Sequence, residues 1–248
     1  MSAYTGGKGG PGVYQSIINQ MPPHRVYIEA FLGAGSVLRA KRPAVATIGI
    51  ERDAAVLLEH WKGTEVPNLT LLHANAIEWL AGHQWQGGEL VYLDPPYLME
   101  TRRDQRGYYA HELSDADHAE LLGVVKSLPC YVLISGYWSE LYARELKDWR
   151  YTCFTTGTRG GGRATEWLWM NFPEPVELHD YRYLGRNFRE RERIARQRRR
   201  WAARLARMSA LQRQALLWAM QDAAGGLGSR LAVSGGVVER EGAALPVL

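Results

Sequence analysis

The stretch RVYIEAFLGAGS, residues 25–36, joins a short apolar run to a turn that contains two glycines. Glycines one residue apart allow a tight turn and let a ligand approach the backbone closely. Similar apolar runs recur over residues 26–172 and alternate with amphipathic stretches. This alternation predicts an α/β domain with a doubly wound, mostly parallel seven-stranded sheet, whose ligands bind at the carboxyl ends of the strands.

The expected elements follow from the period of the apolar residues. The expected strands are 25–30, 46–51, 69–73, 89–93, 131–135, 151–155 and 166–172. The expected helices are 53–61, 76–81, 115–127 and 139–146. Ser114 with Asp117 resembles a capping box at the start of the third helix.

Composition limits the class of protein. The 248 residues contain no apolar stretch approaching the roughly 18 that a membrane-spanning helix needs. The first eight residues lack the apolar segment of a secretory signal, and Cys130 and Cys153 lie in apolar, strand-like runs. We therefore expect a cytoplasmic protein with reduced thiols and no membrane attachment. His111 and His118 have no cysteine or carboxylate at ligand spacing, so no metal site is expected.

Two acidic residues lie close to the glycine turn. Glu29 precedes the turn, and Glu51 ends the second expected strand, where a carboxylate can accept hydrogen bonds from ribose hydroxyls. The turn lacks the full G-x-G-x-x-G pattern, and the chain has no phosphate-binding G-x-x-x-x-G-K-[ST] loop. These features favour S-adenosyl-L-methionine over a dinucleotide or a triphosphate. The alternative is a structural turn without a ligand, because glycine occurs at many strand–helix junctions.

The sequence Asp94-Pro95-Pro96-Tyr97 directly follows the expected strand 89–93. The lone pair of an exocyclic base amine is delocalised, so methylation requires acceptors that hold both amino protons and align the nitrogen with the methyl donor. Asp94 offers one acceptor, and the carbonyl of Pro95 offers another because the prolines restrict the backbone. Tyr97 offers a flat face for a base taken out of its stack. The alternative is a buried aspartate that caps the next element.

Taken in order, these motifs resemble the Dam-like adenine-specific DNA methyltransferases over residues 4–172. The resemblance implies an S-adenosylmethionine-dependent methyltransferase fold and methyl transfer to N6 of a flipped adenine, in a restriction–modification or phage-related setting. It assigns catalysis to Asp94, Pro95, Pro96 and Tyr97. It assigns donor binding to Tyr4, Lys8, Glu29, Phe31, Gly33, Gly35, Glu51 and Asn75, with residues 4–8 closing over the donor.

The chain departs from this family at three places. Ala3 stands where members with strong sequence preference often have lysine, and Asn75 stands where many have an aspartate that contacts the donor's adenine. Only residues 76–93 lie between the third expected strand and the catalytic motif, which is too short for the target-recognition domain that relatives insert there. The resemblance therefore implies short or relaxed sequence specificity.

Three basic segments are candidates for contacts with double-stranded DNA, since arginines bind phosphates and aromatic rings stack on bases. The first follows the catalytic motif and contains Arg102, Arg103, Arg106, Tyr108 and Tyr109. The second, between two expected strands, contains Arg159 and Arg163. The third is an arginine-rich stretch that contains Arg198, Arg199 and Arg200. The alternatives are a solvated loop, a plain hairpin tip and a solvated cationic face.

The C-terminal region differs in composition from the rest. Within it, Ile194, Trp201, Leu205 and Met208 fall on one helical stripe that we expect to pack against another element. Ser209 with Gln212 resembles a capping box that opens a second helix. We therefore divide the chain into a catalytic domain at 1–175, a basic helical arm at 176–222 and a flexible tail at 223–248, where glycine, alanine and serine dominate.

Other functions stay open beside adenine methylation. One is amino-methylation of cytosine or of adenine in RNA, and another is nucleic-acid binding by a methyltransferase fold without turnover. By the same resemblance, glutamine methyltransferases carry asparagine at the head of the P-P-Y motif, and cytosine-amino methyltransferases usually carry serine. Asp94 at this position favours adenine.

Overall fold

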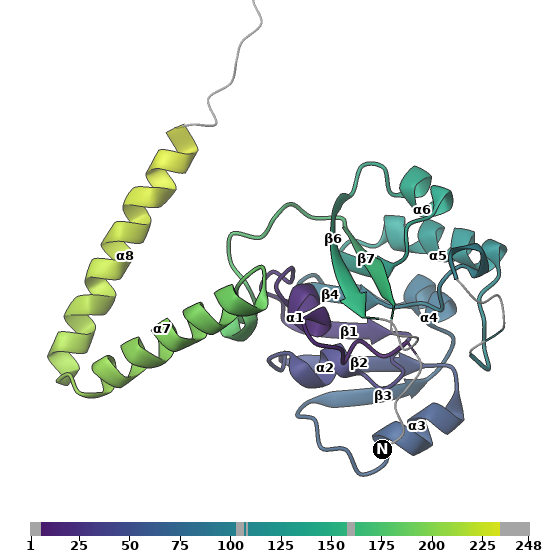
Figure 1. The fold of residues 1–248 in the computed structure, drawn as a ribbon, viewed down its shortest axis with the longest axis horizontal. Coiled ribbons are helices and arrows are strands. Elements are labelled where there is room, and N and C mark those ends of the chain that lie inside the picture. Colours follow the sequence, from purple (N-terminus) through teal and green to yellow (C-terminus); the bar gives the residue numbers. More distant parts are fainter. Residues whose placement is uncertain (1–5, 103–106, 108, 158–161, 234–248) are drawn as a thin grey trace, which may run out of the picture. The chain divides into compact units, whose positions relative to one another are not determined.

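A computed structural model describes residues 6–102, 107, 109–157 and 162–233 of the chain. The chain divides into two compact units, Met1–Ala195 and Arg196–Leu248, each described here by itself. The first unit is built on a seven-stranded sheet with the order β3-β2-β1-β4-β5-β7-β6 (Figure 1). The strands are β1 Val26–Ala30, β2 Ala46–Glu51, β3 Leu69–His73, β4 Glu89–Leu93, β5 Tyr131–Gly136, β6 Arg150–Gly157 and β7 Arg163–Met170.

Strands β1 to β5 pair in parallel, whereas β7 runs antiparallel between β5 and β6. The expected fold class, a doubly wound and mostly parallel sheet of the methyltransferase type, is confirmed. The last expected strand ends too late, because β7 stops at Met170. Just beyond it, the side chain of Asn171 accepts a hydrogen bond from the N–H of Val132 at 2.8 Å and donates one to the carbonyl of Cys130 at 2.8 Å.

Helices cover both faces of the sheet (Figure 1). In the first unit they are α1 Val13–Ile18, α2 Ser36–Ala40, α3 Ala54–Trp61, α4 Ala76–Gly82, α5 Asp115–Ser127 and α6 Glu140–Glu145, with short 3-10 turns at Met99–Thr101 (η1) and Tyr181–Tyr183 (η2). Buried side chains of α1, α2 and α3 share one core cluster, and those of α4, α5 and α6 share the other. All five residues of β4 are consequently buried.

Two features of the helices bear on the sequence-based expectations. The capping box of Ser114 and Asp117 is confirmed, since each side chain accepts from the other's backbone N–H. The helices α1 and α2 were not expected. They have six and five residues, too few to show a helical period in the sequence.

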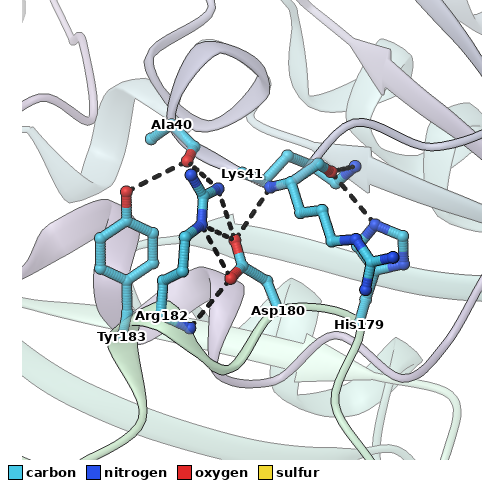
Figure 2. Close-up of polar contacts among 7 residues, drawn as sticks. Ala40, Lys41, His179, Asp180, Arg182 and Tyr183 are labelled. Atoms are coloured by element: carbon cyan, nitrogen blue, oxygen red, sulfur yellow. Dashed lines mark hydrogen bonds and ion pairs between the residues drawn. The ribbon is translucent and has the colours of Figure 1, made fainter. Parts of the chain in front are cut away.

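The segment after β7 returns to the connection between α2 and β2 (Figure 2). There the buried carboxylate of Asp180 accepts hydrogen bonds from the backbone N–H of Arg42 at 2.9 Å and from the guanidinium of Arg182. Arg182 and Tyr183 also donate to the carbonyl of Ala40. These contacts, which we call the Asp180 clamp, attach residues 179–183 to the first unit, beyond residue 175 where the sequence analysis ended the catalytic domain.

Two further helices follow, α7 at Phe188–Ala206 and α8 at Ala210–Val233. The boundary between the two units falls within α7. The second capping box is confirmed, because the N–H of Ser209 donates to Gln212 and the N–H of Gln212 donates to the hydroxyl of Ser209. The expected flexible tail started too early, because residues 223–233 continue α8, in which helix formers such as alanine recur, and residues 234–248 lie outside the described residues.

The apolar stripe that the sequence predicted on α7 is at most partly buried. No residue of α7 is buried among the described residues, and Trp201 is 48% exposed. Ile194, Leu205 and Met208 are partly buried. Among the described residues, no helix combines the length and apolarity needed to cross a membrane.

Candidate active site

A cavity of about 310 Å³ lies where β1, β2, β3 and β4 end. It is bounded by the loop after β1, the last residue of β2 and the residues that follow β3 and β4, as expected for ligand sites of doubly wound sheets. Its walls include every described residue that the family resemblance assigned to the donor: Lys8, Glu29, Phe31, Gly33, Gly35, Glu51 and Asn75. Tyr4 lies outside the described residues.

The loop after β1 has an unusual backbone. Phe31, Gly33 and Gly35 have φ values of 62°, 51° and 61°. A side chain at Gly35 would begin 2.2 Å from the ring of Trp61, whose indole N–H donates to the carbonyl of Gly33 at 2.7 Å. A positive φ is costly for a bulky residue such as Phe31, and such strain is concentrated at ligand sites. The Trp61 ring therefore fixes a loop whose shape only glycine permits at position 35.

Glu51 lies at the end of β2 and is held by backbone N–H groups. One carboxylate oxygen accepts from Gly33 at 2.8 Å and the other accepts from Asp53 at 2.9 Å. Each oxygen of a carboxylate has a second lone pair, so both can accept a further hydrogen bond from a ligand. Two acceptors fixed side by side match the two adjacent hydroxyls of a ribose.

Asn75 lines the cavity but serves first as the cap of α4. Its side-chain oxygen accepts from the N–H of Ile77 at 3.1 Å, and its amide nitrogen donates to Glu78 at 2.7 Å. These partners occupy the amide oxygen and one N–H of Asn75. The contact with a donor's adenine that the resemblance implied therefore has less of the side chain available than the sequence suggested.

Glu29 is buried in the wall of the cavity and accepts a hydrogen bond from the hydroxyl of Tyr27 at 2.7 Å. Burial raises the pKa of Glu29 to about 8, with a further contribution from the charge of Asp94, and the Tyr27 hydrogen bond only partly opposes this. Burial therefore favours the neutral form of Glu29.

The four residues of the catalytic motif lie together at the end of β4. Asp94 and Pro96 line the cavity, Pro95 is buried, and Tyr97 lies beside the cavity with its ring 4.6 Å from that of Tyr137. Lys8, from the N-terminal segment, reaches this group and forms an ion pair of 2.6 Å with Asp94. Asp94 and Pro96 thus share one cavity with the donor-binding residues.

Asp94 is oriented by two partners on the same oxygen. Its Oδ1 accepts from the Lys8 ammonium and from the hydroxyl of Ser135 at 2.9 Å. Ser135 in turn is hydrogen-bonded to the hydroxyl of Tyr92 at 2.9 Å. Among the described residues, no group donates to Oδ2 of Asp94, so this oxygen can accept a hydrogen bond from a ligand amine.

Two neighbours of Asp94 were missed by sequence reasoning. Ser135 lies at the end of β5, and Glu166 lies within β7, where it is 4% exposed. Glu166 contacts Lys8 at 3.2 Å and accepts a short hydrogen bond from the hydroxyl of Tyr97. A glutamate inside the apolar run TEWLWM is the signal that would have identified it, because a charge in a buried strand needs a partner.

The residues predicted to bind DNA lie in different surroundings. Arg103, Arg106, Tyr108 and Arg159 lie outside the described residues. Arg102 does not extend into solvent as expected for a phosphate contact: its side chain is 6% exposed and forms a two-point ion pair with Glu112. Its Nε also donates to the carbonyl of Tyr97 at 2.8 Å, so Arg102 braces the catalytic loop.

The remaining candidates lie at three different places. Tyr109 lines the cavity, and burial raises the pKa of its hydroxyl to about 12, so it belongs to the cavity wall and not to an outer surface. Arg163 is exposed at the start of β7. Arg198, Arg199 and Arg200 are exposed on α7, in the second unit. These four arginines remain candidates for phosphate contacts.

The fold is the α/β type found in methyltransferases, with a cavity at the carboxyl ends of its parallel strands. Residues 60–151 match the family model of the D12 class N6 adenine-specific DNA methyltransferases, which confirms the resemblance over a segment that includes Asp94 to Tyr97. No curated protein sequence matches the chain. Among the described residues, no group of three or more histidine, cysteine, aspartate or glutamate side chains could hold a metal ion.

Several solved structures resemble the chain at low sequence identity. One is spermidine synthase from Thermotoga maritima, 13% identical over 67% of this chain and 61% of that chain, with a TM-score of 0.46. Another is a dimethyladenosine transferase from Plasmodium falciparum, 12% identical over 64% and 62% of the two chains, with a TM-score of 0.41. A Streptococcus mutans protein assigned as a methyltransferase, solved with S-adenosyl-L-homocysteine, is 10% identical over 63% and 94%, with a TM-score of 0.44.

Proposed function

We propose that the protein transfers a methyl group from S-adenosyl-L-methionine to the N6 amine of adenine in double-stranded DNA. The observation that carries this proposal is the position of Asp94, which lines the same cavity as the glycine loop and Glu51. A donor held by that loop lies within reach of an amine that is bound by Asp94. The family match over residues 60–151 supports adenine as the substrate.

The cavity suits the proposed donor. The two carboxylate oxygens of Glu51 can accept hydrogen bonds from ribose hydroxyls. The loop after β1, with its positive φ values, allows a ligand to lie against the backbone. Bound S-adenosyl-L-methionine supplies a methyl group on a positively charged sulfur.

The catalytic motif is proposed to act by holding the amine in a reactive orientation. Lys8 and Ser135 fix one oxygen of Asp94, and the other oxygen is proposed to accept a hydrogen bond from the amine. The Pro95 carbonyl is proposed as acceptor of the second amino proton. Holding both protons out of the base plane localises the nitrogen lone pair toward the methyl group, so reactivity is gained through orientation and electrostatics without a covalent intermediate.

Tyr97 is proposed to stack on the adenine after it leaves the duplex. The hydroxyl of Tyr97 is held by Lys8 at 2.6 Å and by Glu166, which fixes the plane of the ring before a base arrives. A fixed aromatic face lowers the entropy cost of binding the extruded base.

The sequence specificity is proposed to be short or relaxed. Between Asn75 and Asp94 the chain contains only α4 and β4, so no recognition domain is inserted there. Exposed arginines of α7 and Arg163 provide affinity for phosphates, which all DNA sequences share.

The test is methyl transfer with labelled donor to duplex DNA, followed by sequencing that maps the modified bases. We expect N6-methyladenine in duplex DNA, at a short or degenerate site. Label found in cytosine, or in RNA alone, would replace the substrate in this proposal. Donor binding without transfer to any nucleic acid would favour a binding protein that has lost turnover.

A further inference from the structure

Glu166 is a buried acid that is not proposed to contact the donor or the target amine in the reaction described above. It lies in β7, a strand none of whose residues lines the cavity, and its side chain is 5% exposed. A buried carboxylate is costly unless it is paired. Both of its partners, Lys8 and Tyr97, belong to the catalytic group around Asp94.

The Lys8 ammonium has three protons, and three acceptors surround it. These are Oδ1 of Asp94 at 2.6 Å, the hydroxyl of Tyr97 at 2.6 Å and Oε1 of Glu166 at 3.2 Å. All three protons are therefore used, and the direction of the ammonium is fixed. One cation is shared between a carboxylate after β4 and a carboxylate in β7.

The Tyr97 hydroxyl closes a triangle with the other two groups. It accepts from Lys8 and donates to Glu166. Without a carboxylate at position 166, the tyrosine loses its acceptor, and Lys8 has no second anion to draw it away from Asp94. The ring could then rotate, and the whole ammonium charge would compete with a substrate amine for Asp94.

We propose that Glu166 is a positioning residue that holds Lys8 and the Tyr97 ring in the arrangement that leaves Asp94 able to bind the target amine. This inference rests on the proposed function. Glu166 acts through Lys8 and Tyr97 and is not proposed to contact the substrate.

The charges in this group are consistent with such coupling. Burial alone lowers the pKa of Lys8, but the charges of Asp94 and Glu166 outweigh it and raise that pKa above its usual value. Burial raises the pKa of Glu166, and the charge of Lys8 only partly opposes this. Removing the Glu166 charge should therefore make the Lys8 amine easier to deprotonate and more reactive.

The test compares Glu166→Gln with Glu89→Gln. Both replace a buried glutamate by a residue of the same size, but Glu89 lies at the start of β4, at the opposite end of that strand from Asp94, and accepts from the N–H of Gln86. For Glu166→Gln we expect kcat to fall about tenfold while the Kd of the donor changes by less than about threefold. Glu89→Gln should match wild type in both.

A second measurement does not depend on methyl transfer. Acylation of Lys8 by acetic anhydride, followed by mass spectrometry across a pH series, reports the reactivity of its amine. Lys8 should be acylated at least about threefold faster in Glu166→Gln than in wild type or Glu89→Gln at the same pH, since its pKa is lower. If Glu166→Gln fails to fold, Tyr97→Phe breaks the same triangle and should lower kcat with an unchanged donor Kd.

The outcomes separate this inference from the proposed function. Wild-type kcat together with wild-type Lys8 reactivity in Glu166→Gln would overturn the positioning role. An equal loss of kcat in Glu89→Gln would also overturn it, because any buried charge would then matter. If wild-type protein methylates no nucleic acid, the proposed function fails, whereas the acylation rates still decide whether Glu166 fixes Lys8.

Discussion

Two buried carboxylates, Asp180 and Glu166, lie in contrasting surroundings within the first unit. Asp180 lies in the clamp that joins residues 179–183 to α2 (Figure 2), and Glu166 lies in the group around the cavity. Both are at most 4% exposed, and both are paired with a cation. The two sites differ in how many donors satisfy the carboxylate.

Asp180 is surrounded by N–H donors on both oxygens. Arg182 donates from its backbone and from its guanidinium, and the backbone N–H of Arg42 donates as well. Burial opposes ionisation of Asp180, but these hydrogen bonds outweigh it and the pKa is lowered. The clamp has no acceptor capacity left for a ligand, so its role is structural.

Around the cavity, one ammonium serves two carboxylates. Burial raises the pKa of Glu166, and the charge of Lys8 opposes this rise only in part. The second oxygen of Asp94 has no donor among the described residues. Incomplete satisfaction costs stability, and such sites are where a ligand can complete the hydrogen bonds.

The largest predicted effect tests the cavity side of this comparison. Asp94→Asn should lower methyl transfer by about 10²–10³-fold, because the asparagine side chain has a single acceptor oxygen and no charge. The Kd of S-adenosyl-L-methionine, measured by calorimetric titration, should stay near the wild-type value. Methyl transfer within tenfold of wild type would remove Asp94 from the catalytic role.

The next effect tests the clamp. Asp180→Asn should lower the free energy of unfolding by about 2–3 kcal/mol, because buried N–H donors lose a charged acceptor. Since the pKa of Asp180 is lowered in the folded protein, this contribution is present at neutral pH and is lost below about pH 4. Urea unfolding of both proteins at a series of pH values measures it.

The exposed Asp148→Asn is the matched control for the clamp and should change stability little. At saturating substrate, kcat of Asp180→Asn should equal that of wild type. A loss of activity without a loss of stability would mean that the clamp, too, belongs to the catalytic site.

A smaller effect is expected at the ribose side of the cavity. Glu51→Ala should raise the donor Kd by at least about tenfold, since two charged hydrogen bonds are removed, and kcat at saturating donor should stay close to wild type. The exposed Glu65→Ala serves as control. Normal donor binding by Glu51→Ala would show that this carboxylate only braces Gly33 and Asp53.

The smallest effect on catalysis is expected outside both carboxylate sites, on α7. Changing Arg198, Arg199 and Arg200 to Gln should weaken DNA binding and lower the slope of log K against log salt by about 0.9 for each phosphate that the arm no longer neutralises. The methylated adenines should stay the same. Changing the exposed Lys62, Arg144 and Lys147 to Gln controls for net charge.

A truncation that tests the arm should end at Ala195, where the first unit ends. Ending the chain at Glu177 would remove Asp180 and Arg182 and would destabilise the first unit, so a loss of DNA binding could not be assigned to the arm. If the shortened protein methylates a different set of adenines, the arm reads sequence and does more than bind phosphates.

The sequence by itself determined the sheet, the glycine loop and the catalytic motif. Each of these depends on a local signal: the two-residue alternation and apolar runs of strands, glycines where φ is positive, and prolines that stiffen a loop. Glu29 and Glu51 followed because strand ends of a parallel sheet meet at one edge, whereas Tyr4, Lys8, Phe31 and Asn75 were assigned by the family resemblance. Local signals therefore located Glu29, Gly33, Glu51 and Asp94 before any contact was known.

The tertiary structure alone decided which charges meet. Glu166 contacts Tyr97 across 69 positions of sequence, and Asp180 contacts the backbone of Arg42 across 138. Arg102, which has the sequence character of a phosphate contact, is paired with Glu112. The sequence around a charged residue does not indicate which residue it pairs with. Pairing depends on the strand order and on the paths of the loops, and both follow from packing the whole core.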